Sequence, residues 1–515
     1  MPALHLMLLF AALAPLPLQG AGATGRAGPA DLAKWHGRSV YFVVTDRFAR
    51  DAGNASSSAA GCGNGTKEWC GGTLRGVTRQ LDYIAGMGFD ALWITPVVEQ
   101  VPWRDHWNGT GYHGYWARDF HEIDPHLGTK EDLSALSAAC KQRGMLLMVD
   151  VVANHVGPIH SIEQLTALGP QLNSPSGAQV HTLDRRPGET MAQYISCPDV
   201  WPNCAHPVEM TSAGRPPFGS NASGVCYPNY TFGGGCNHTV ILDGWFGDLA
   251  DLNQEHPPTA VYLLDWIQGM VKNYSIDGLR LDTALYMPCA FLRQFQQAAG
   301  VYIVGEVVTT NHSLHRSFSP PLSGLLNFPL SLHFRGGEIW GHAADGQRGS
   351  MQALATVLEE QSQAQYPDPH LLGNFLDNHD GQRFLYDHAA GGDAILQNGL
   401  ALVMLYHGVP IVYYGTEQPA LAGLADQRTA MFNQYSTSTP VYKFLAQINS
   451  IRRAMGFAPG GADVHTEASI VPTLITDHHT LVIVRGGVVV LLSNRGRHTS
   501  SAVSGVDAPP HAQGS

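Results

Sequence analysis

The sequence predicts an α/β fold: a TIM-type (β/α)8 barrel with an irregular insert after the third strand and a short C-terminal antiparallel β-domain. Eight short apolar runs alternate with helix-like stretches, about 120 residues separate the third run from the fourth, and the pattern changes after residue 455. Apolar runs that alternate with helices are typical of buried parallel strands. Eight such units favour a barrel. A doubly wound sheet is the alternative, but no G-x-G-x-x-G opens a helix after the first run.

The runs divide the chain into a barrel with two attachments. They cover residues 39–48, 89–97, 144–155, 275–284, 301–308, 324–331, 371–380 and 409–418. We therefore expect the barrel in residues 24–155 and 256–455. Residues 156–255, rich in Pro and Gly, form the predicted insert. Residues 456–515 carry the runs IVPTLIT, HTLVIVR and VVVLLSN, which predict antiparallel strands.

The N-terminus has the features of a signal peptide. Leu6 to Leu18 is an apolar run of 13 residues, and Ala21-Gly22-Ala23 matches an A-x-A cleavage site. A membrane anchor or a core segment is the alternative, but the run is too short to span a bilayer. The C-terminal residues have no hydrophobic tail for a lipid anchor. The sequence thus predicts a signal peptide in residues 1–23, secretion, and no membrane anchor.

Composition excludes several classes of partner. The 515 residues carry 30 Lys and Arg against 42 Asp and Glu, a net charge of −12, and charged residues make up only 14%. The chain is too apolar to be disordered. Its sparse basic residues argue against nucleic acid, and its acidic balance argues against an anionic membrane. These numbers fit a neutral substrate, and we expect a monomer.

The eight cysteines include three close pairs. Short loops rich in Gly, Pro or Asn separate the members of each pair, so we expect disulfides Cys62–Cys70, Cys197–Cys204 and Cys226–Cys236. A four-cysteine zinc site is the alternative, but it needs closer spacing. Cys140 and Cys289 lie in helix-like segments and are expected to be free. Eight glycosylation sequons support secretion, at Asn54, Asn64, Asn108, Asn221, Asn229, Asn237, Asn273 and Asn311.

Polar side chains gather where the predicted strands end, which is where barrel enzymes hold their active residues. They are Asp150, His155, Arg280, Asp282, Glu306, His379 and Asp380. Three of the carboxylates, Asp282, Glu306 and Asp380, should therefore meet at one mouth. Neighbouring buried acids do not ionise together, so one keeps its proton. Glycoside hydrolysis needs that pairing of an ionised nucleophile with a protonated acid. Capping or structural ion pairing is the alternative for each residue alone.

Four segments resemble the signature regions of glycoside hydrolase family 13, the α-amylase family. They are DVVANH (150–155), GLRLDTALY (278–286), GEVV (305–308) and FLDNHD (375–380). Longer stretches, including VYFVVTDRFAR and NYSIDGLRLDT, are similar to fungal-type secreted α-amylases. The resemblance covers about residues 37 to 455 and is weak in the insert and beyond residue 457.

The resemblance implies a role for each strand-end residue. Asp282 would be the nucleophile that forms a β-glucosyl-enzyme, and Glu306 the general acid and then the base. Asp380 would bind sugar hydroxyls and help distort the ring, and Arg280 would orient Asp282 and keep it ionised. Because such a mechanism retains configuration, the carboxyl groups of Asp282 and Glu306 should lie roughly 5–5.5 Å apart.

The resemblance also implies substrate contacts. His155 and His379 would donate hydrogen bonds to hydroxyls of the same sugar. Tyr115 would stack on the glucose at the cleavage point, and Trp116 would contact a neighbouring sugar, since aromatic faces suit the apolar faces of glucose. Arg428 would contact a donor-side sugar. Core packing is the alternative for the two histidines and the aromatic pair, and a surface salt bridge for Arg428.

Calcium is the cofactor that the resemblance implies, because hard oxygen ligands suit Ca2+. Asn154 and Asp251 would supply side-chain oxygens, and Leu242 and Tyr286 would supply backbone carbonyls. The ion would tie the insert to the barrel. For Asp251 alone, a helix cap or a loop acid is the alternative.

The sequence departs from the family pattern at three points. Leu285-Tyr286 replaces a usual Lys-His, which removes a donor on the leaving-group side, and Asp377 stands where Glu is common. Only about 60 residues follow residue 455, fewer than the family's terminal β-domain usually has. We expect a secreted retaining α-amylase that cleaves internal α-1,4 bonds of starch, glycogen and maltooligosaccharides. An α-glucanotransferase and a non-catalytic carbohydrate-binding protein are the alternatives.

Overall fold

A computed structural model supplies the structure of the chain. It describes residues 32–51, 62, 65–105, 108–169, 178–182, 188, 190–195, 208–210, 238–246, 248–334, 337–340, 349–471 and 479–494. The predicted signal peptide, the pairs Cys197–Cys204 and Cys226–Cys236, and the sequons at Asn54, Asn64, Asn221, Asn229 and Asn237 lie outside the described residues.

Eight parallel strands form the central sheet, and each falls inside one of the eight predicted runs. They are β1 (Val40–Val43), β2 (Ala91–Ile94), β5 (Leu146–Val151), β10 (Gly278–Leu281), β11 (Tyr302–Gly305), β12 (Gly324–Leu325), β13 (Gly373–Asn374) and β14 (Val409–Tyr413). The order is β12-β11-β10-β5-β2-β1-β14-β13. A parallel bridge between Leu326 and Gly373 joins the two ends. The barrel prediction is therefore confirmed.

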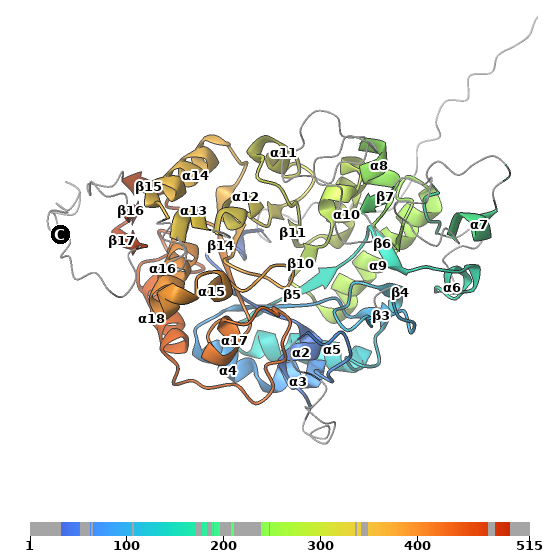
Figure 1. The fold of residues 1–515 in the computed structure, drawn as a ribbon, viewed down its shortest axis with the longest axis horizontal. Coiled ribbons are helices and arrows are strands. Elements are labelled where there is room, and N and C mark those ends of the chain that lie inside the picture. Colours follow the sequence, from blue (N-terminus) through green and yellow to red (C-terminus); the bar gives the residue numbers. More distant parts are fainter. Residues whose placement is uncertain are drawn as a thin grey trace, which may run out of the picture.

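Helices surround this barrel (Figure 1). The longer ones are α3 (Leu74–Arg79), α4 (Leu81–Gly86), α5 (Lys130–Gln142), α9 (Pro257–Tyr274), α10 (Cys289–Ala299), α11 (His312–Ser317), α14 (Met351–Gln363), α16 (Gly392–Leu405) and α18 (Pro440–Ala454). Short turns of helix follow several strands: α2 (Thr45–Phe48), η3 (Ala284–Tyr286), α12 (Phe328–Ser331), η4 (Leu332–Phe334), α13 (Gly337–Trp340), η5 (Pro369–Leu371), α15 (Phe384–Asp387), η6 (Ala389–Gly391) and α17 (Pro419–Ala422).

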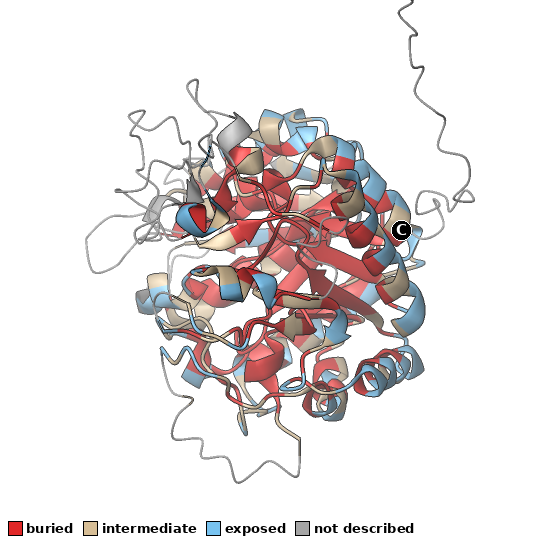
Figure 2. Cartoon of the chain, turned by 90° about the vertical axis from the view of Figure 1, so that its right-hand side faces the viewer, coloured by how far each residue is buried: buried red, intermediate tan, exposed pale blue. Residues whose placement is uncertain are grey.

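Local sequence explains where these helices begin and what they bury. Thr129 and Asp132 form a capping box at the start of α5, so two otherwise unpaired backbone N–H groups are satisfied. Phe291, Leu292 and Phe295 lie on one face of α10 and are buried. Figure 2 shows the same division for the whole molecule, with buried residues in the barrel and exposed ones on the outer helices.

Two smaller sheets lie on the barrel's loops. After β2 comes a hairpin of β3 (Val98–Gln100) and β4 (Ala117–Ile123), which the sequence did not predict. In the predicted insert, β6 (His155–Pro158), β9 (Leu249–Asp251), β8 (Trp245–Phe246) and β7 (Val208–Met210) form a second sheet in that order. Three short helices accompany it, namely α6 (Ile162–Thr166), α7 (Met191–Ile195) and α8 (His238–Asp243).

The C-terminal segment forms the expected antiparallel sheet. It consists of β15 (Ala468–Val471), β16 (Thr480–Arg485) and β17 (Val488–Ser493), in sequence order. Leu481, Ile483, Val490 and Leu492 are buried and belong to the same apolar core as the barrel. The short β-domain therefore packs on the barrel and shares its core.

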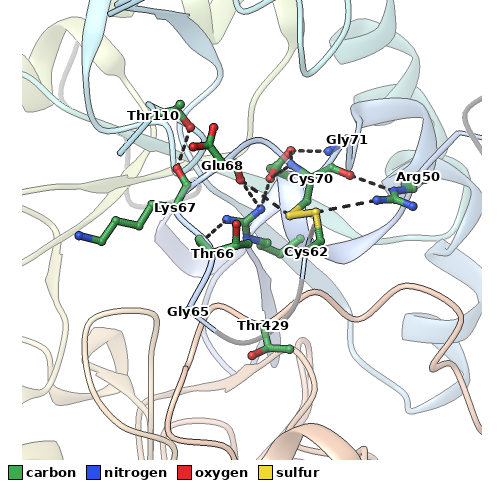
Figure 3. The surroundings of a disulfide bond; sticks show 12 residues. Arg50, Cys62, Gly65, Thr66, Lys67, Glu68, Cys70, Gly71, Thr110 and Thr429 are labelled. Atoms are coloured by element: carbon green, nitrogen blue, oxygen red, sulfur yellow. Dashed lines mark hydrogen bonds and ion pairs between the residues drawn. A yellow bond between two sulfur atoms is a disulfide. The ribbon is translucent and has the colours of Figure 1, made fainter. Parts of the chain in front are cut away.

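The predicted Cys62–Cys70 disulfide is present, and Cys140 and Cys289 are free as expected. Figure 3 shows the disulfide loop held by arginines, with Arg50 Nε donating to the carbonyl of Cys70 at 2.9 Å. The N–H of Gly65 in this loop donates to Asp426 Oδ2 at 2.7 Å. Of the helices that the structure describes, none combines the length and the apolar character needed to cross a bilayer.

Candidate active site

The strand order places the predicted residues at one end of the barrel. The N–H of Asp282 donates to the carbonyl of Val151 on β5, and the N–H of Glu306 donates to the carbonyl of Leu281 on β10, each at 2.9 Å. These bonds extend the sheet register by one residue past the strands. Backbone pairing therefore fixes the positions of Asp282 and Glu306 independently of any side-chain contact.

A cavity of about 380 Å³ opens at this end, a size typical of small-ligand sites. Eight of the nine predicted catalytic and substrate-binding residues line it, namely Tyr115, Trp116, His155, Asp282, Glu306, His379, Asp380 and Arg428. Its other lining residues are His113, Leu249, Thr283, Tyr286, Val308, Phe328, Leu332 and Asn378. The ninth residue, Arg280, is fully buried behind them.

Arg280 holds three carboxylates at once. Its Nη1 contacts Asp282 Oδ1 at 2.6 Å and Asp150 Oδ1 at 2.9 Å, and its Nη2 lies 2.9 Å from Glu306 Oε1. One buried cation therefore faces three acids, too little positive charge for all of them to ionise. The contacts with Asp282 and Glu306 also bring the two predicted reacting carboxyl groups to the same guanidinium.

The pKa values of two acids respond to this crowding. Burial raises the pKa of Glu306 to about 8; the charge of Arg280 opposes this, and the charges of Asp282 and Asp380 add to it. Burial likewise raises the pKa of Asp150 to about 7, against the effect of Arg280. Near neutral pH, Glu306 therefore carries its proton, as a general acid must.

Asp380 is in a different environment. Its side chain is 43% exposed, Arg428 Nη2 donates to its Oδ1 at 2.7 Å, and His379 Nε2 lies 3.1 Å from its Oδ2. Partial burial opposes ionisation, but the charges of His379, which is protonated in the acidic range where Asp380 titrates, and of Arg428 and Arg280 lower the pKa of Asp380 to about 2. Arg428 Nε also donates to the carbonyl of His379 at 2.8 Å. Asp380 thus presents an ionised carboxylate to the cavity.

Aromatic and imidazole rings also line the cavity. The ring of Tyr115 stacks on His379 with centroids 5.2 Å apart, and its hydroxyl donates to Asp150 Oδ2 at 2.7 Å. Burial lowers the pKa values of His379, to about 3, and of His155, so both rings are neutral near pH 7. A neutral imidazole both donates and accepts hydrogen bonds, as recognition of sugar hydroxyls requires.

The disulfide loop is connected to the cavity through Asp426. Gly65 in the loop binds one oxygen of Asp426, whose other oxygen accepts from the N–H of Arg428 at 2.9 Å. The loop closed by Cys62–Cys70 therefore supports the segment that carries Arg428.

The backbone next to Asp282 is strained. Thr283 has φ 48° and ψ 34°, the left-handed region, which β-branched residues rarely adopt. In this conformation its N–H donates to Glu306 Oε2 at 2.9 Å. The strained residue therefore positions the predicted acid next to the predicted nucleophile.

Two of the four predicted calcium ligands have buried oxygens that suit a hard cation. Asn154 Oδ1 and Asp251 Oδ1 are buried and have no hydrogen-bond partner. Their segments are adjacent, because the N–H of Leu252 donates to the carbonyl of Asn154 at 2.8 Å. Unpaired buried oxygens are unfavourable unless an ion binds them. Leu242 lies in α8, and Tyr286 lies in η3 with its side chain against the cavity.

The sequence predicts no role for three residues of this region. Asp150 stands at a predicted strand end, and in the structure it binds Arg280, Tyr115 and the indole N–H of Trp93. His113 lines the cavity, and its position two residues before Tyr115 in GYHGYW was the available signal. His181, bonded to Asp251 at 2.6 Å, lies in the insert, where the resemblance is weak.

Comparison with known proteins agrees with the fold and with the strand-end carboxylates described above. Residues 42–455 match the family described as "Alpha amylase, catalytic domain". An α-amylase of Saccharomycopsis fibuligera is 31% identical over 478 residues, which cover 92% of this chain and 84% of that protein.

Solved structures extend the comparison. An α-amylase from Malbranchea cinnamomea shares 33% identity and a TM-score of 0.71, over 90% of this chain and 86% of that one. A three-domain cyclomaltodextrin glucanotransferase shares 25% identity and a TM-score of 0.63, over 87% and 85%. With its barrel, its strand-end carboxylates and these matches, the chain belongs to the α-amylase family of glycoside hydrolases.

Proposed function

We propose that this chain is a retaining, endo-acting α-amylase that hydrolyses α-1,4-glucosidic bonds of starch, glycogen and maltooligosaccharides. The observation that carries the proposal is the arrangement around Arg280. Asp282 and Glu306 contact the same guanidinium, yet the pKa of Glu306 is raised to about 8. A protonated acid thus lies beside a carboxylate that can attack, which is what glycoside cleavage with retention requires.

In the first step, Asp282 attacks the anomeric carbon, and Glu306 gives its proton to the leaving glycosidic oxygen. The bond from Arg280 Nη1 to Asp282 Oδ1 fixes the attacking carboxylate. The N–H of Thr283 fixes Glu306 through its Oε2. The products of this step are a covalent glucosyl-enzyme and a shortened chain with a new non-reducing end.

In the second step, Glu306, now ionised, takes a proton from water, and the water oxygen attacks the glucosyl carbon. Asp282 leaves as a carboxylate, so the configuration is retained. Asp380, His379 and Arg428 form one hydrogen-bonded group at the cavity. They would bind hydroxyls of the donor sugar, while Tyr115 and Trp116 offer it aromatic faces.

An α-glucanotransferase is the second candidate, and one feature of the cavity favours it. Part of the lining is apolar and consists of Leu249, Val308, Phe328 and Leu332. Leu285 is apolar and buried, so position 285 adds no hydrogen-bond donor. Such a surface would hold a sugar acceptor by its apolar faces and exclude water. The structural similarity to the solved glucanotransferase described above also supports this candidate.

Digestion of maltoheptaose tests both candidates in one experiment. We expect only shorter chains, with new reducing ends that first appear as the α-anomer, measured by chromatography and by proton NMR. Chains longer than maltoheptaose would establish the glucanotransferase instead. First-formed β-anomers would contradict retention, and no turnover with Ca2+ present would leave the carbohydrate-binding alternative.

We also propose a structural calcium ion held by Asn154 and Asp251, with carbonyls of Leu242 and Tyr286 completing the set. The unpaired buried oxygens of Asn154 and Asp251 support this site. When bound, the ion supplies positive charge and joins the insert to the barrel. It takes no part in the chemical steps, which the side chains above perform.

Chelation should therefore destabilise the chain. An ion that binds only the folded state adds about 3 kcal/mol at 100 times its dissociation constant. We expect a chelator to lower the melting temperature by about 3 °C and then to reduce activity. Asp251→Asn should melt at the same temperature with and without chelator. Asp248→Asn, in the neighbouring turn, is the control and should keep the difference; equal melting of the wild type in both buffers would refute the site.

We further propose that the chain is secreted as a monomer after loss of residues 1–23, with no nucleic-acid partner. In this proposal the barrel comprises residues 24–155 and 256–455, and residues 156–255 and 456–515 are its attachments. The exposed sequon Asn273 on α9 supports secretion. The net charge of −12 suits a neutral glucan.

A further inference from the structure

A second group of metal-ligating side chains lies in the insert, apart from the cavity. His181 follows the bridge residue Val180, Asp243 ends α8, and Glu255 lies between β9 and α9. One ligand atom of each lies within 4.8 Å of the others. The three lie 12 to 74 positions apart in sequence, so the fold, and no local turn, brings them together.

The distances between these ligand atoms fit ligands of one metal ion better than hydrogen bonds between the side chains. His181 Nε2 lies 3.5 Å from Glu255 Oε2 and 3.8 Å from Asp243 Oδ1. Hydrogen bonds of this kind measure about 2.7–3.2 Å. Two ligands of a tetrahedral Zn2+, with bonds of about 2.0–2.2 Å, lie roughly 3.4 Å apart. The imidazole nitrogen and the carboxylates thus leave a gap of the right size for such an ion.

Asp251 orients the imidazole toward that gap. Its Oδ2 lies 2.6 Å from His181 Nδ1, and His181 is only 8% exposed. A proton on Nδ1, donated to the carboxylate, leaves the lone pair on Nε2, which faces Asp243 and Glu255. Metal-binding histidines in proteins are commonly fixed by a carboxylate in this way.

The charges in the group also call for a cation. Asp251, Asp243 and Glu255 surround a single imidazole. The charged groups with the largest effects on His181, Asp243 and Asp251 all belong to this set of four side chains. A calcium ion at Asn154 and Asp251 would contact Oδ1 of Asp251, not the Oδ2 that binds His181. It would leave the negative charges of Asp243 and Glu255 uncompensated.

We propose that His181 Nε2, Asp243 and Glu255 form a second metal site, selective for a divalent transition metal of the Zn2+ type and joined to the proposed calcium site through Asp251. One imidazole nitrogen with two carboxylates suits Zn2+, whereas Ca2+ prefers oxygen ligands alone. Water would complete the coordination. The site is independent of the proposed activity, since none of the three ligands lines the cavity.

Zinc titration of the full chain tests this site. The protein is stripped with chelator, returned to excess Ca2+, and titrated with ZnCl2 by calorimetry, with metal content measured by atomic emission. We expect one Zn2+ per chain for the wild type at micromolar zinc. His181→Ala should abolish this binding, and Glu255→Gln should weaken it at least about 10-fold. His160→Ala, which removes a histidine paired with Asp248 at 2.9 Å, is the matched control and should bind like the wild type.

Glu255→Gln keeps the test meaningful if His181→Ala does not fold, because the Glu255 side chain is 58% exposed. Its calcium content should stay at that of the wild type. Failure of the wild type to bind zinc would overturn the proposal and identify protonated His181 as the charge that neutralises these acids. Zinc binding that both variants retain would also overturn it, since the ion would then lie elsewhere.

Discussion

Asp282→Asn is expected to lower kcat on soluble starch at least ~10⁴-fold, measured by release of reducing ends. The amide cannot attack the anomeric carbon, so the glucosyl-enzyme does not form. Arg280 keeps its contacts with Asp150 and Glu306 in this variant, so the fold should persist. Binding of maltooligosaccharides should change far less than kcat, because the contacts of Asp380 and Arg428 are untouched.

Asp82→Asn is the matched control for this experiment. This substitution removes the same charge as Asp282→Asn. The Asp82 side chain lies on α4, pairs with Arg143 and is 82% exposed. It should retain wild-type activity. An Asp282→Asn protein that is folded by circular dichroism and still degrades starch at the wild-type rate would refute the nucleophile assignment.

Glu306→Gln should lower kcat on starch about 10³-fold, because the leaving oxygen then receives no proton. Maltosyl fluoride, whose leaving group needs no proton, should form the glucosyl-enzyme at close to the wild-type rate. The pH dependence has a definite sign. Since the pKa of Glu306 is raised to about 8, the wild-type rate on starch should fall as pH rises through that value, when the acid loses its proton.

The variant itself supplies the check on this interpretation. Its residual rate should show no fall near pH 8, since the titrating group is gone. Glu131→Gln, on the exposed side of α5, is the control and should keep the wild-type profile. An alkaline fall that persists in Glu306→Gln would assign the general acid to another residue. So would an equal loss in the rate of starch cleavage and in the rate of glucosyl-enzyme formation from the fluoride, followed as the first burst of fluoride release.

The barrel was predictable because each strand is a buried apolar run bounded by polar residues. Even β12 and β13, only two residues long, fall inside predicted runs. The hairpin of β3 and β4 was missed. Its pairing shifts register twice, and β4 alternates buried and exposed residues irregularly, so no period of two marks it in the sequence.

The candidate site was predictable from strand ends and motifs, but its internal contacts were not. Asp150 binds Arg280 across 130 positions of sequence, and only the parallel register of β5 and β10 makes that contact possible. The pairing of His181 with Asp251 spans 70 positions. The first contact depends on the register of the barrel strands and the second on how the insert folds, and no local pattern encodes either.

The conformation of Thr283 serves the proposed chemistry at the expense of the stability of the fold. A left-handed conformation at such a residue costs about 1–3 kcal/mol, which is a sizeable part of the net stability of a typical protein. The strained conformation at Thr283 aims a backbone donor at Glu306. The ground state is therefore less stable than the same barrel with a relaxed turn there, and selection for heat resistance and selection for turnover act on this residue in opposite directions.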